Sequence, residues 1–488
     1  MIQSYEAGRS ELSFGFFDGL MFSGLCFFIC ALFLFPVFVG GSFHNQARIA
    51  QTFLFSLAAL YIALRRWNLP LHLTKSAKLV FGLLVIFSVT SGVHAINKAA
   101  SLRELGLFLG VAGFVIAIVH ICFRSGFEQR LVKIIIAGWA LYSLKFLLML
   151  AMVLVDGQRP NAWLLISGFD NPRFLNHSQT IALPLLAGIC LNKKLSFPWR
   201  GIAAFALVVN FMLLAMTFGR ATILALLCIA VLSALVFAEI GRKLAAVIIL
   251  AGMFGYLFFH LIFEVVPAWR DLSIAAQIKN SSEAGSDHSR FLLWNLAIEY
   301  FKSSPILGVG PMNFAEFKNP KGAHPHNIYL QVLSEFGLPF FLLFFGSLVV
   351  QVVRLTQYLK LNLQHFATSG IALGSFLALV AAAIDGIFSG NFVMPTSQVW
   401  IALTLGLFLA SLARQRCLVE LSGLRRQGSS NLLWRGFLVL LLCSQLWMAI
   451  QSLKEVMQPE PRIGVRSQTT EPSELWRPRY WLDGWLGK

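Results

Sequence analysis

Long runs of apolar residues recur along almost the whole chain, and they constrain its fold more than any other feature. Each run is close to the ~20 residues that an α-helix needs to cross a lipid bilayer. Of the 488 residues, 57% are hydrophobic and 12% are charged, which is more apolar surface than a water-soluble protein can bury. The sequence therefore predicts an all-α, polytopic integral membrane protein.

We predict thirteen membrane spans, with twelve as the alternative, because the last apolar run contains Arg435 and Gln445. With thirteen spans the C-terminal tail lies outside the cytoplasm. If the last run lay at the membrane surface instead of crossing it, the tail would be cytoplasmic. The spans divide the chain into membrane helices one to nine (1–265), a hydrophilic insert (266–325), membrane helices ten to thirteen (326–452) and a tail (453–488). The predicted spans are 18–40, 47–64, 77–96, 101–123, 131–155, 174–191, 199–218, 221–239, 244–265, 327–353, 366–388, 396–413 and 432–452.

Basic residues are distributed unevenly between alternate loops. One set of short loops carries eighteen lysines and arginines, whereas the alternate set carries six. The positive-inside rule makes the richer set cytoplasmic, which places the N-terminus in the cytoplasm and the insert on the opposite, periplasmic face. The net charge of +17 is therefore mainly a mark of topology, and no nucleic-acid partner is expected.

Two of the few outer basic residues adjoin apolar spans. Arg220 lies in a tight turn between the seventh and eighth spans, where it is either a snorkelling side chain at a helix end or a functional group. Arg173 and His177 stand at the start of the sixth span, in a segment rich in polar residues. Such a cluster at membrane level indicates either a water-filled cavity or a polar seam between helices.

An amphipathic helix is predicted in the insert over residues 287–301, because apolar residues recur there at helical spacing. Ser289 is its predicted N-cap, and Pro305 lies beyond its end. Arg290 would then lie in the first helical turn, where the helix dipole disfavours a cation unless an anion binds beside it. A surface ion pair between Arg290 and Asp287 is the alternative.

Four polar residues mark the start of the tenth span: His324, His326, Asn327 and Glu335. A histidine, with an ordinary pKa of ~6.5, can accept a proton near neutral pH, and guanidinium groups bind phosphates bidentately. This combination fits a phosphate-bearing donor and a proton acceptor. The alternatives are structural hydrogen bonds for the histidines and a buried ion pair for Glu335. The acidic residues of the insert lack the spacing of metal ligands, so no metal is expected.

Three motifs resemble the bacterial O-antigen ligase and polymerase superfamily, which includes related pilin O-oligosaccharyltransferases. The order of the motifs and the long outer loop between the ninth and tenth spans also match. Gly219 departs from the pattern, because the family often has a serine immediately before the first arginine. The motifs are Thr217-Phe218-Gly219-Arg220, the run Arg290, Trp294, Pro305, Gly308-Val309-Gly310 and Phe314, and the run His326-Asn327, Tyr329-Leu330-Gln331 and Glu335-Phe336-Gly337-Leu338-Pro339.

The resemblance implies a fold related to the C-type glycosyltransferases and a multi-pass enzyme of the bacterial inner membrane. It implies metal-independent, inverting transfer of a glycan from undecaprenyl diphosphate, without a cofactor. Arg220 and Arg290 would bind the diphosphate, and His326 would accept the proton of the acceptor hydroxyl. The further candidates for substrate binding are Arg173, His177, His324, Asn327 and Glu335.

The sequence does not identify the acceptor. Lipid A core (a ligase), a growing glycan chain (a polymerase) and a pilin hydroxyl (an oligosaccharyltransferase) fit equally, and the ligase leads on family frequency alone. Besides the donor and the acceptor, membrane lipids are the expected partners. A lipid-linked glycan flippase or a small-solute transporter is the alternative from another class, although the chain shows no internal repeat with paired midplane charges.

Overall fold

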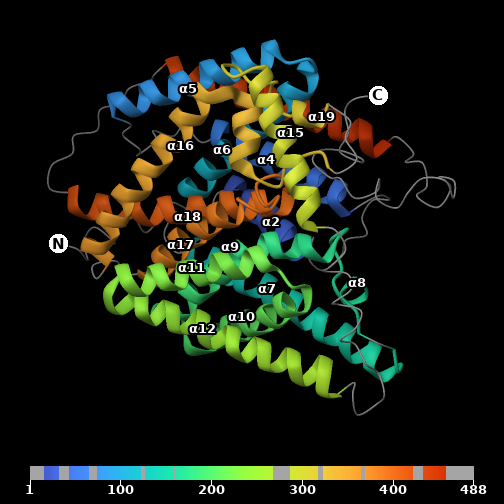
Figure 1. Ribbon diagram of the computed structural model, residues 1–488. Helices are drawn as coiled ribbons and strands as arrows, with labels where there is room; N and C mark the ends of the chain where they lie inside the picture. The colour runs from blue at the N-terminus through green and yellow to red at the C-terminus, as the bar shows by residue number, and fades with distance from the viewer. Residues whose placement is uncertain are drawn as a thin grey trace, which may run out of the picture.

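The computed structural model describes residues 16–31, 43–64, 74–122, 127–158, 160–266, 286–316, 322–363, 369–420 and 432–457. Within these ranges the regular secondary structure is helical, and no β-strand occurs (Figure 1). A helix lies at each of the thirteen predicted spans, although several helices extend beyond the predicted ends. Most of the predicted tail lies outside the described residues.

The helices have the following bounds, in chain order. They are α2 (Phe16–Cys26) with η1 (Phe27–Ala31), α4 (Phe43–Leu64), α5 (Lys75–His94), α6 (Lys98–Cys122), α7 (Phe127–Val155), α8 (Ala162–Leu165), α9 (Pro172–Cys190), α10 (Phe197–Thr217), α11 (Arg220–Val236), α12 (Ala238–His260) with η2 (Leu261–Val265), α15 (Ser286–Ser303), η3 (Asn313–Ala315), α16 (Ile328–Asn362), α17 (Ser369–Asp385), α18 (Pro395–Glu420) and α19 (Leu432–Met457).

Apolar side chains cover the outside of the bundle as well as its centre. Eight of the described helices are long and apolar enough to cross a membrane, and four shorter apolar helices accompany them. In α5 only 6% of the most apolar window is buried within the protein, and in α16 only 17%. Exposed apolar faces of this extent are stable against lipid and not against water. The protein is therefore an all-α, polytopic membrane protein, as predicted.

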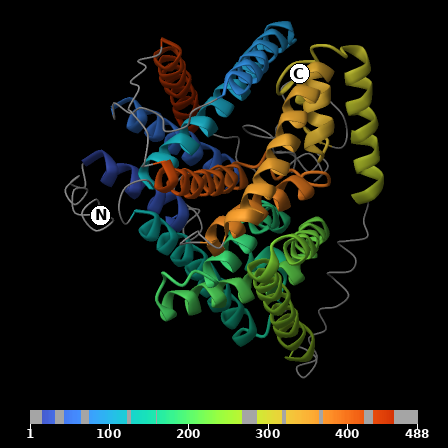
Figure 2. The same cartoon turned by 90° about the vertical axis from the view of Figure 1, so that its left-hand side faces the viewer.

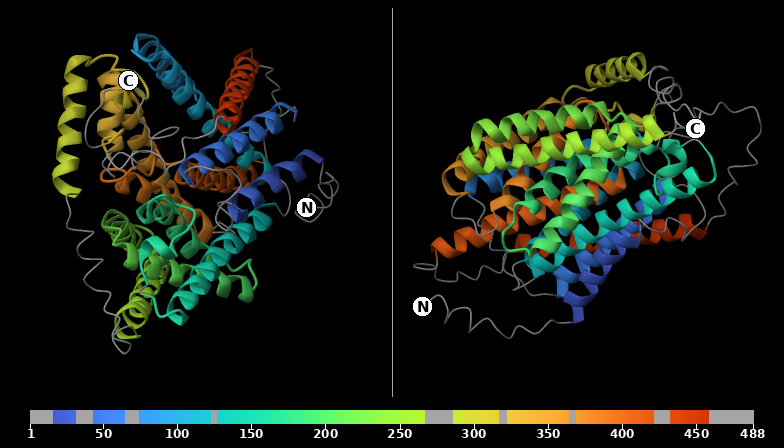
Figure 3. Two further views of the ribbon diagram at one scale, coloured as in Figure 1. Left: turned by 90° about the vertical axis from the view of Figure 1, so that its right-hand side faces the viewer. Right: turned by 90° about the horizontal axis from the view of Figure 1, so that it is seen from below.

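The helices form three neighbouring groups. α9, α10, α11 and α12 pack together, and α17 lies against α9 and α11. α4, α6, α18 and α19 form the second group, and α18 connects it to the first through contacts with α9 and α17. The third group contains α5, α15 and α16, which lie at the edge of the bundle in Figures 2 and 3. Segments from the first and third groups contribute to the candidate site described below.

α9 and α17 are antiparallel and approach each other through glycines. A Cβ atom at Gly188 would lie 2.2 Å from the carbonyl oxygen of Gly370 and 2.9 Å from Cα of Gly374. Small residues allow two membrane helices to come into backbone contact in this way. This glycine seam joins the end of α9 to the start of α17, and it therefore also aligns the start of α9 with the end of α17.

α16 is broken at Gly337, where φ is 79° and ψ is 175°. Pro339 has no backbone N–H, so the carbonyl of Glu335 loses the partner that a continuous helix would supply. The N–H of Leu338 is also diverted, because it donates to the carbonyl of Pro305 at 2.8 Å. The predicted span 327–353 thus consists of two helical segments and not of one continuous helix.

The loop that follows α15 fills this break in α16. The N–H of Val309 donates to the Ser334 carbonyl at 2.9 Å, and the N–H of Gly310 donates to the Glu335 carbonyl at 3.0 Å. Both carbonyls would otherwise lack backbone donors, which is costly away from water. Gly308 allows the close approach, because its φ is +69° and a Cβ there would lie 2.2 Å from the Glu335 carbonyl carbon.

α15 is the helix predicted for the insert, and it lies beside α16. It begins at Ser286, so the prediction that Ser289 is the N-cap is wrong, and Arg290 lies beyond the first turn.

We expect Gly188→Ala to lower the thermal stability of the purified protein, because its methyl group would force the backbones of α9 and α17 apart. Overpacking of this kind typically costs about 1–3 kcal/mol. Gly201→Ala is the matched control, since Gly201 is also helical but a Cβ there meets nothing within 4 Å. Thermal unfolding in detergent measures both variants. Equal melting temperatures would contradict a backbone-tight seam.

Candidate active site

The turn between α10 and α11 packs on the first turns of α9 through hydroxyl groups. Thr217 Oγ1 donates to Asn176 Oδ1 at 2.8 Å, and Thr222 Oγ1 donates to the carbonyl oxygen of Asn176 at 3.3 Å. These bonds hold Arg220, the first residue of α11, close enough to Arg173 for the two positive charges to act on each other. Two of the predicted site arginines are thus brought together by α9.

The departure at Gly219 from the family motif has a steric explanation. Phe218 ends α10 in the left-handed conformation, with φ at 50°, and this turns the chain sharply towards Arg220. A Cβ at Gly219 would lie 2.5 Å from the amide nitrogen of Asn176. Asn176 therefore occupies the space that a serine side chain would need, and glycine fits at residue 219.

The loop that carries the predicted histidines is attached to the end of α17. Asn327 is the N-cap of α16, and its side-chain oxygen accepts hydrogen bonds from the N–H of Tyr329 and from the next N–H, both at 3.0 Å. The N–H of Ile328 donates to the Gly386 carbonyl at 2.9 Å, and the Tyr329 hydroxyl donates to the Ala383 carbonyl at 3.0 Å. The contacts of Asn327 make it a capping residue that fixes this loop.

His326 has an unusual backbone conformation for a residue other than glycine, with φ at +53°. Its N–H donates to His324 Nδ1 at 3.2 Å, and the two ring centroids are 4.0 Å apart. His324 itself is buried. Residues in this conformation persist where their surroundings determine them, and they are frequent at functional sites.

α15 reaches the same loop through Trp294, whose indole N–H donates to the Pro325 carbonyl at 3.1 Å. Arg290 lies one helical turn before Trp294. Its positive charge acts on both His326 and His177. The helix of the insert thus delivers a guanidinium group to the imidazoles of α9 and of the α16 loop.

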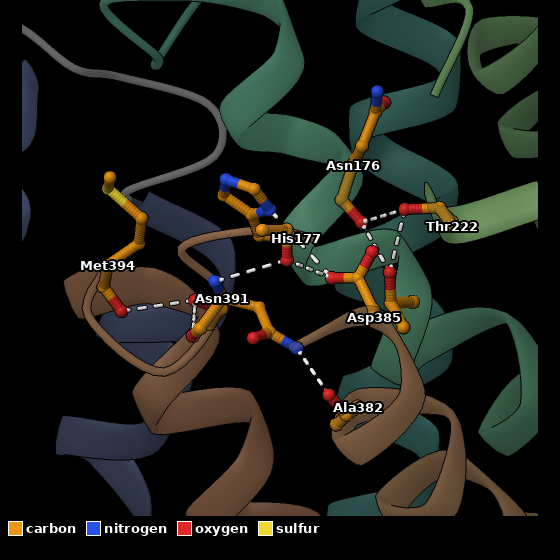
Figure 4. A network of polar contacts seen from close by, with 10 residues as sticks. Asn176, His177, Thr222, Ala382, Asp385, Asn391 and Met394 are labelled. Carbon is orange, nitrogen blue, oxygen red and sulfur yellow. Dashed lines mark hydrogen bonds and ion pairs between the residues drawn. The ribbon is translucent and has the colours of Figure 1, made fainter. Parts of the chain in front are cut away.

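Asp385, the last residue of α17, adds a carboxylate to this cluster. Its side chain is 1% exposed, and Oδ2 lies 4.0 Å from Nδ1 of His177 (Figure 4). Ser389 donates a hydrogen bond to the same oxygen, and the hydroxyls of Thr180 and Thr222 lie near the carboxylate. Among the described residues, no donor reaches Oδ1 at hydrogen-bonding distance. The carboxylate therefore keeps an acceptor oxygen in the middle of the cluster.

Asp385 is absent from the candidates predicted from the sequence, although a signal for it exists. It lies near the end of the predicted span 366–388, and ionisable residues inside apolar spans usually mark function. Its partner His177 is two hundred residues away in the chain, so the pairing itself has no local signature.

The protonation of His326 follows from its surroundings. The residue lies in the loop outside α16, where loss of solvent and, to a smaller extent, the positive charge of Arg290 together lower its pKa to about 4. Because the ordinary histidine pKa is ~6.5, the imidazole is neutral at pH 7. A neutral imidazole is able to accept a proton from a substrate.

Glu335 has a different position from the other predicted site residues. Its carboxylate accepts a hydrogen bond from the N–H of Phe314 at 3.0 Å, and its carbonyl accepts one from the hydroxyl of Ser91 at 2.9 Å. These contacts belong to the break in α16 and to the loop that fills it. The structure therefore gives Glu335 a part in attaching that loop, while the arginines, His177, His326 and Asp385 form one cluster.

The fold and the site together place this protein in a class. It is a multi-helix membrane protein with a cluster of guanidinium, imidazole and carboxylate groups. Among the residues that the structure describes, no group of three or more histidine, cysteine, aspartate or glutamate side chains is placed to hold a metal ion.

The family model described as O-Antigen ligase matches residues 203–345 of the chain. The match contains Arg220, Arg290 and His326, and it confirms the resemblance inferred from the motifs. Members of this family are glycosyltransferase-like enzymes. No curated protein matches the chain significantly.

We expect Gly219→Ser to destabilise the protein, because the new side chain would collide with Asn176 and displace the turn that carries Arg220. Asn176→Ala in the same chain should relieve part of the collision, so the double variant should lose less stability than the sum of the two single variants. Melting temperatures of the wild type and the three variants test this. Additive losses would show that the two residues do not compete for space.

Proposed function

We propose that this protein transfers a glycan from undecaprenyl diphosphate to an acceptor hydroxyl, without a metal ion or another cofactor. The observation that carries the proposal is the convergence of Arg173, Arg220 and Arg290 with a half-buried, neutral His326. Such a set supplies both the positive charge that a diphosphate requires and a base for the attacking hydroxyl. The family match supports the same reaction class.

The arginines bind and stabilise the leaving group in this proposal. As the bond between the sugar C1 and the diphosphate oxygen breaks, negative charge grows on undecaprenyl diphosphate. Guanidinium groups fixed beforehand around that oxygen stabilise the charge without rearranging, which is where electrostatic catalysis is most effective. Arg220 and Arg290 have this role, and Arg173 adds a further charge beside Arg220.

His326 acts as the general base in this proposal. The acceptor oxygen attacks C1 from the face opposite the diphosphate, so a new C1–O bond forms, the old one breaks and the anomeric configuration inverts. The hydroxyl proton passes to the neutral imidazole of His326. The carboxylate of Asp385, which interacts with both His177 and Arg290, offsets the positive charge that then appears in the cluster.

The membrane topology of the proposal rests on the distribution of basic residues. With the Lys- and Arg-rich loops in the cytoplasm, the N-terminus is cytoplasmic and the cluster faces the periplasm of the bacterial inner membrane. A donor that has been flipped to that face would meet the cluster at the headgroup level. The family description makes the lipid A core the first acceptor to test.

We expect His326→Ala and Arg290→Ala each to reduce glycan transfer by at least about 100-fold, because they remove the base and a stabilising charge. The assay uses purified protein in detergent with lipid-linked glycan and lipid A core, a growing glycan chain or pilin as acceptor. Membrane transport cannot occur in detergent, so product formation separates a transferase from a flippase.

Lys302→Ala is the matched control for these variants, since Lys302 is a basic residue in the last turn of the same helix, α15. It should transfer at the wild-type rate. Near-normal transfer by His326→Ala or Arg290→Ala would contradict the role assigned to that residue, and no product with any acceptor would contradict the function.

The acidic limb of the pH profile reports the protonation of His326. Because the base must be neutral and its pKa is lowered to about 4, kcat/KM should stay nearly constant from pH 7 down to about pH 5 and fall below that. An unperturbed histidine would already halve the rate near pH ~6.5. Initial rates between pH 4 and 8 at low donor concentration measure this limb. A midpoint at ~6.5 would contradict a base whose pKa is lowered by its surroundings.

A further inference from the structure

The turn that connects α17 to α18, residues 386–394, is mostly buried although it has no regular structure. Asn391 is 0% exposed, and Val393 and Met394 are 6% and 4% exposed. Connecting segments normally lie at the surface, because their backbone groups need water or another partner. The buried 386–394 turn must therefore be held by groups from the rest of the protein.

Arg48, a fully buried residue of α4, supplies those groups. Its Nη2 donates to the Val393 carbonyl at 2.7 Å, and its Nη1 donates to Oε1 of Gln398 and Oε1 of Gln51, also at 2.7 Å. Gln398 in turn donates to the Phe392 carbonyl at 2.7 Å. Two successive carbonyls of the turn are thus held by one arginine and its glutamine partner.

The other side of the same turn touches the candidate active site. The Ser389 hydroxyl donates to Oδ2 of Asp385, and Asn391 Nδ2 donates to the Ala382 carbonyl at 2.8 Å (Figure 4). Gly390 lies directly against the imidazole of His324, since a Cβ there would lie 2.6 Å from its Cε1. The turn therefore lies between Arg48 and two groups of the site, Asp385, which is near His177, and His324, which is stacked beside His326.

α4 is also connected to the start of α9. The carboxylate of Asp170 accepts hydrogen bonds from the first two N–H groups of α4, those of Phe43 at 2.7 Å and His44 at 2.9 Å. Asp170 precedes Arg173 by three residues. The first turns of α4 consequently hold both the segment that leads into α9 and the turn that follows α17.

We propose that Arg48 is a positioning residue for glycan transfer: by fixing the 386–394 turn, it sets the placement of Asp385 and of the His324–His326 pair. The inference rests on the function proposed above. Arg48 donates from a planar, rigid fork, so it can hold Val393 and Gln398 at fixed separation. A lysine is a single point charge on a flexible stem and cannot reproduce that geometry.

The pH profile distinguishes positioning from simple stabilisation. The titratable and charged groups that act on His326 are His324 in its own loop, His177 on α9 and Arg290 on α15, and Asp385 on α17 acts in turn on His177 and Arg290. A loosened 386–394 turn admits water to these groups, so the acidic limb of kcat/KM should move towards the ordinary histidine value of ~6.5. A purely structural role would lower the amount of folded enzyme and leave the limb unchanged.

We expect Arg48→Met and Arg48→Lys to lower kcat/KM by about 10- to 100-fold and to raise the midpoint of the acidic limb. The assay is transfer by the full-length protein in detergent, corrected for the folded fraction by size-exclusion chromatography. Gln398→Ala removes fewer hydrogen bonds, so it should change kcat/KM and the midpoint of the acidic limb by less. This variant replaces the Arg48 variants in the test if those do not fold.

Arg414→Met is the matched control, because Arg414 lies on α18 like Gln398 but binds Glu128 and the Cys122 carbonyl near the other end of that helix. It should reduce stability without moving the acidic limb. A double variant of Arg48→Met with Gly390→Ala should be less impaired than the product of the single effects, because both act through one turn.

The outcomes separate this inference from the function on which it rests. Wild-type kcat/KM and an unmoved limb in Arg48→Met, while His326→Ala is inactive, would overturn the positioning role alone. An equal limb shift in Arg414→Met would also overturn it, because the effect would then follow from general destabilisation. If the wild type transfers no glycan to any acceptor, the proposed function fails first.

Discussion

Pro339 has no backbone N–H, and much of the outer architecture depends on that missing donor. A continuous helix would leave the Glu335 carbonyl unsatisfied, so α16 breaks at Gly337 and accepts donors from the loop after α15. The break therefore serves as the attachment point of the insert. Because α15 is held there at one end and by Trp294 near the other, Arg290 is delivered to the loop that contains His326.

The cluster combines groups that oppose one another electrostatically. Arg173 and Arg220 carry like charges close together, and the positive charge of Arg290 acts on the imidazoles of His326 and His177. Such repulsion makes an empty site costly, and a bound dianion would remove that cost. The buried carboxylate of Asp385 balances only part of the positive charge. The arrangement is thus suited to an anionic ligand that arrives and departs.

The membrane helices, and the places of three residues of the candidate site, could be predicted from the sequence for physical reasons. Apolar runs of bilayer length have almost no alternative to the helix, and Arg220, Arg290 and His326 lie in short local motifs. Other features depend on contacts between distant segments. Asp385 is a candidate only because it lies beside His177. The sequence places Arg48 among six basic residues of the outer loops, but it is a buried residue of α4. The helix break at Glu335 has a local signal, because Gly337 and Pro339 follow it, but the loop that fills the break comes from a distant segment.

The glycine seam between α9 and α17 has a consequence for the protein in bilayers of different thickness. Transmembrane helices adapt to a thicker or thinner hydrocarbon layer mainly by tilting. Where Gly188 meets Gly370 and Gly374, backbone lies against backbone with no side chain between them to deform, so the two helices tilt together. The separation of His177 from Asp385, at the opposite ends of these same helices, is thereby insulated from changes in lipid composition.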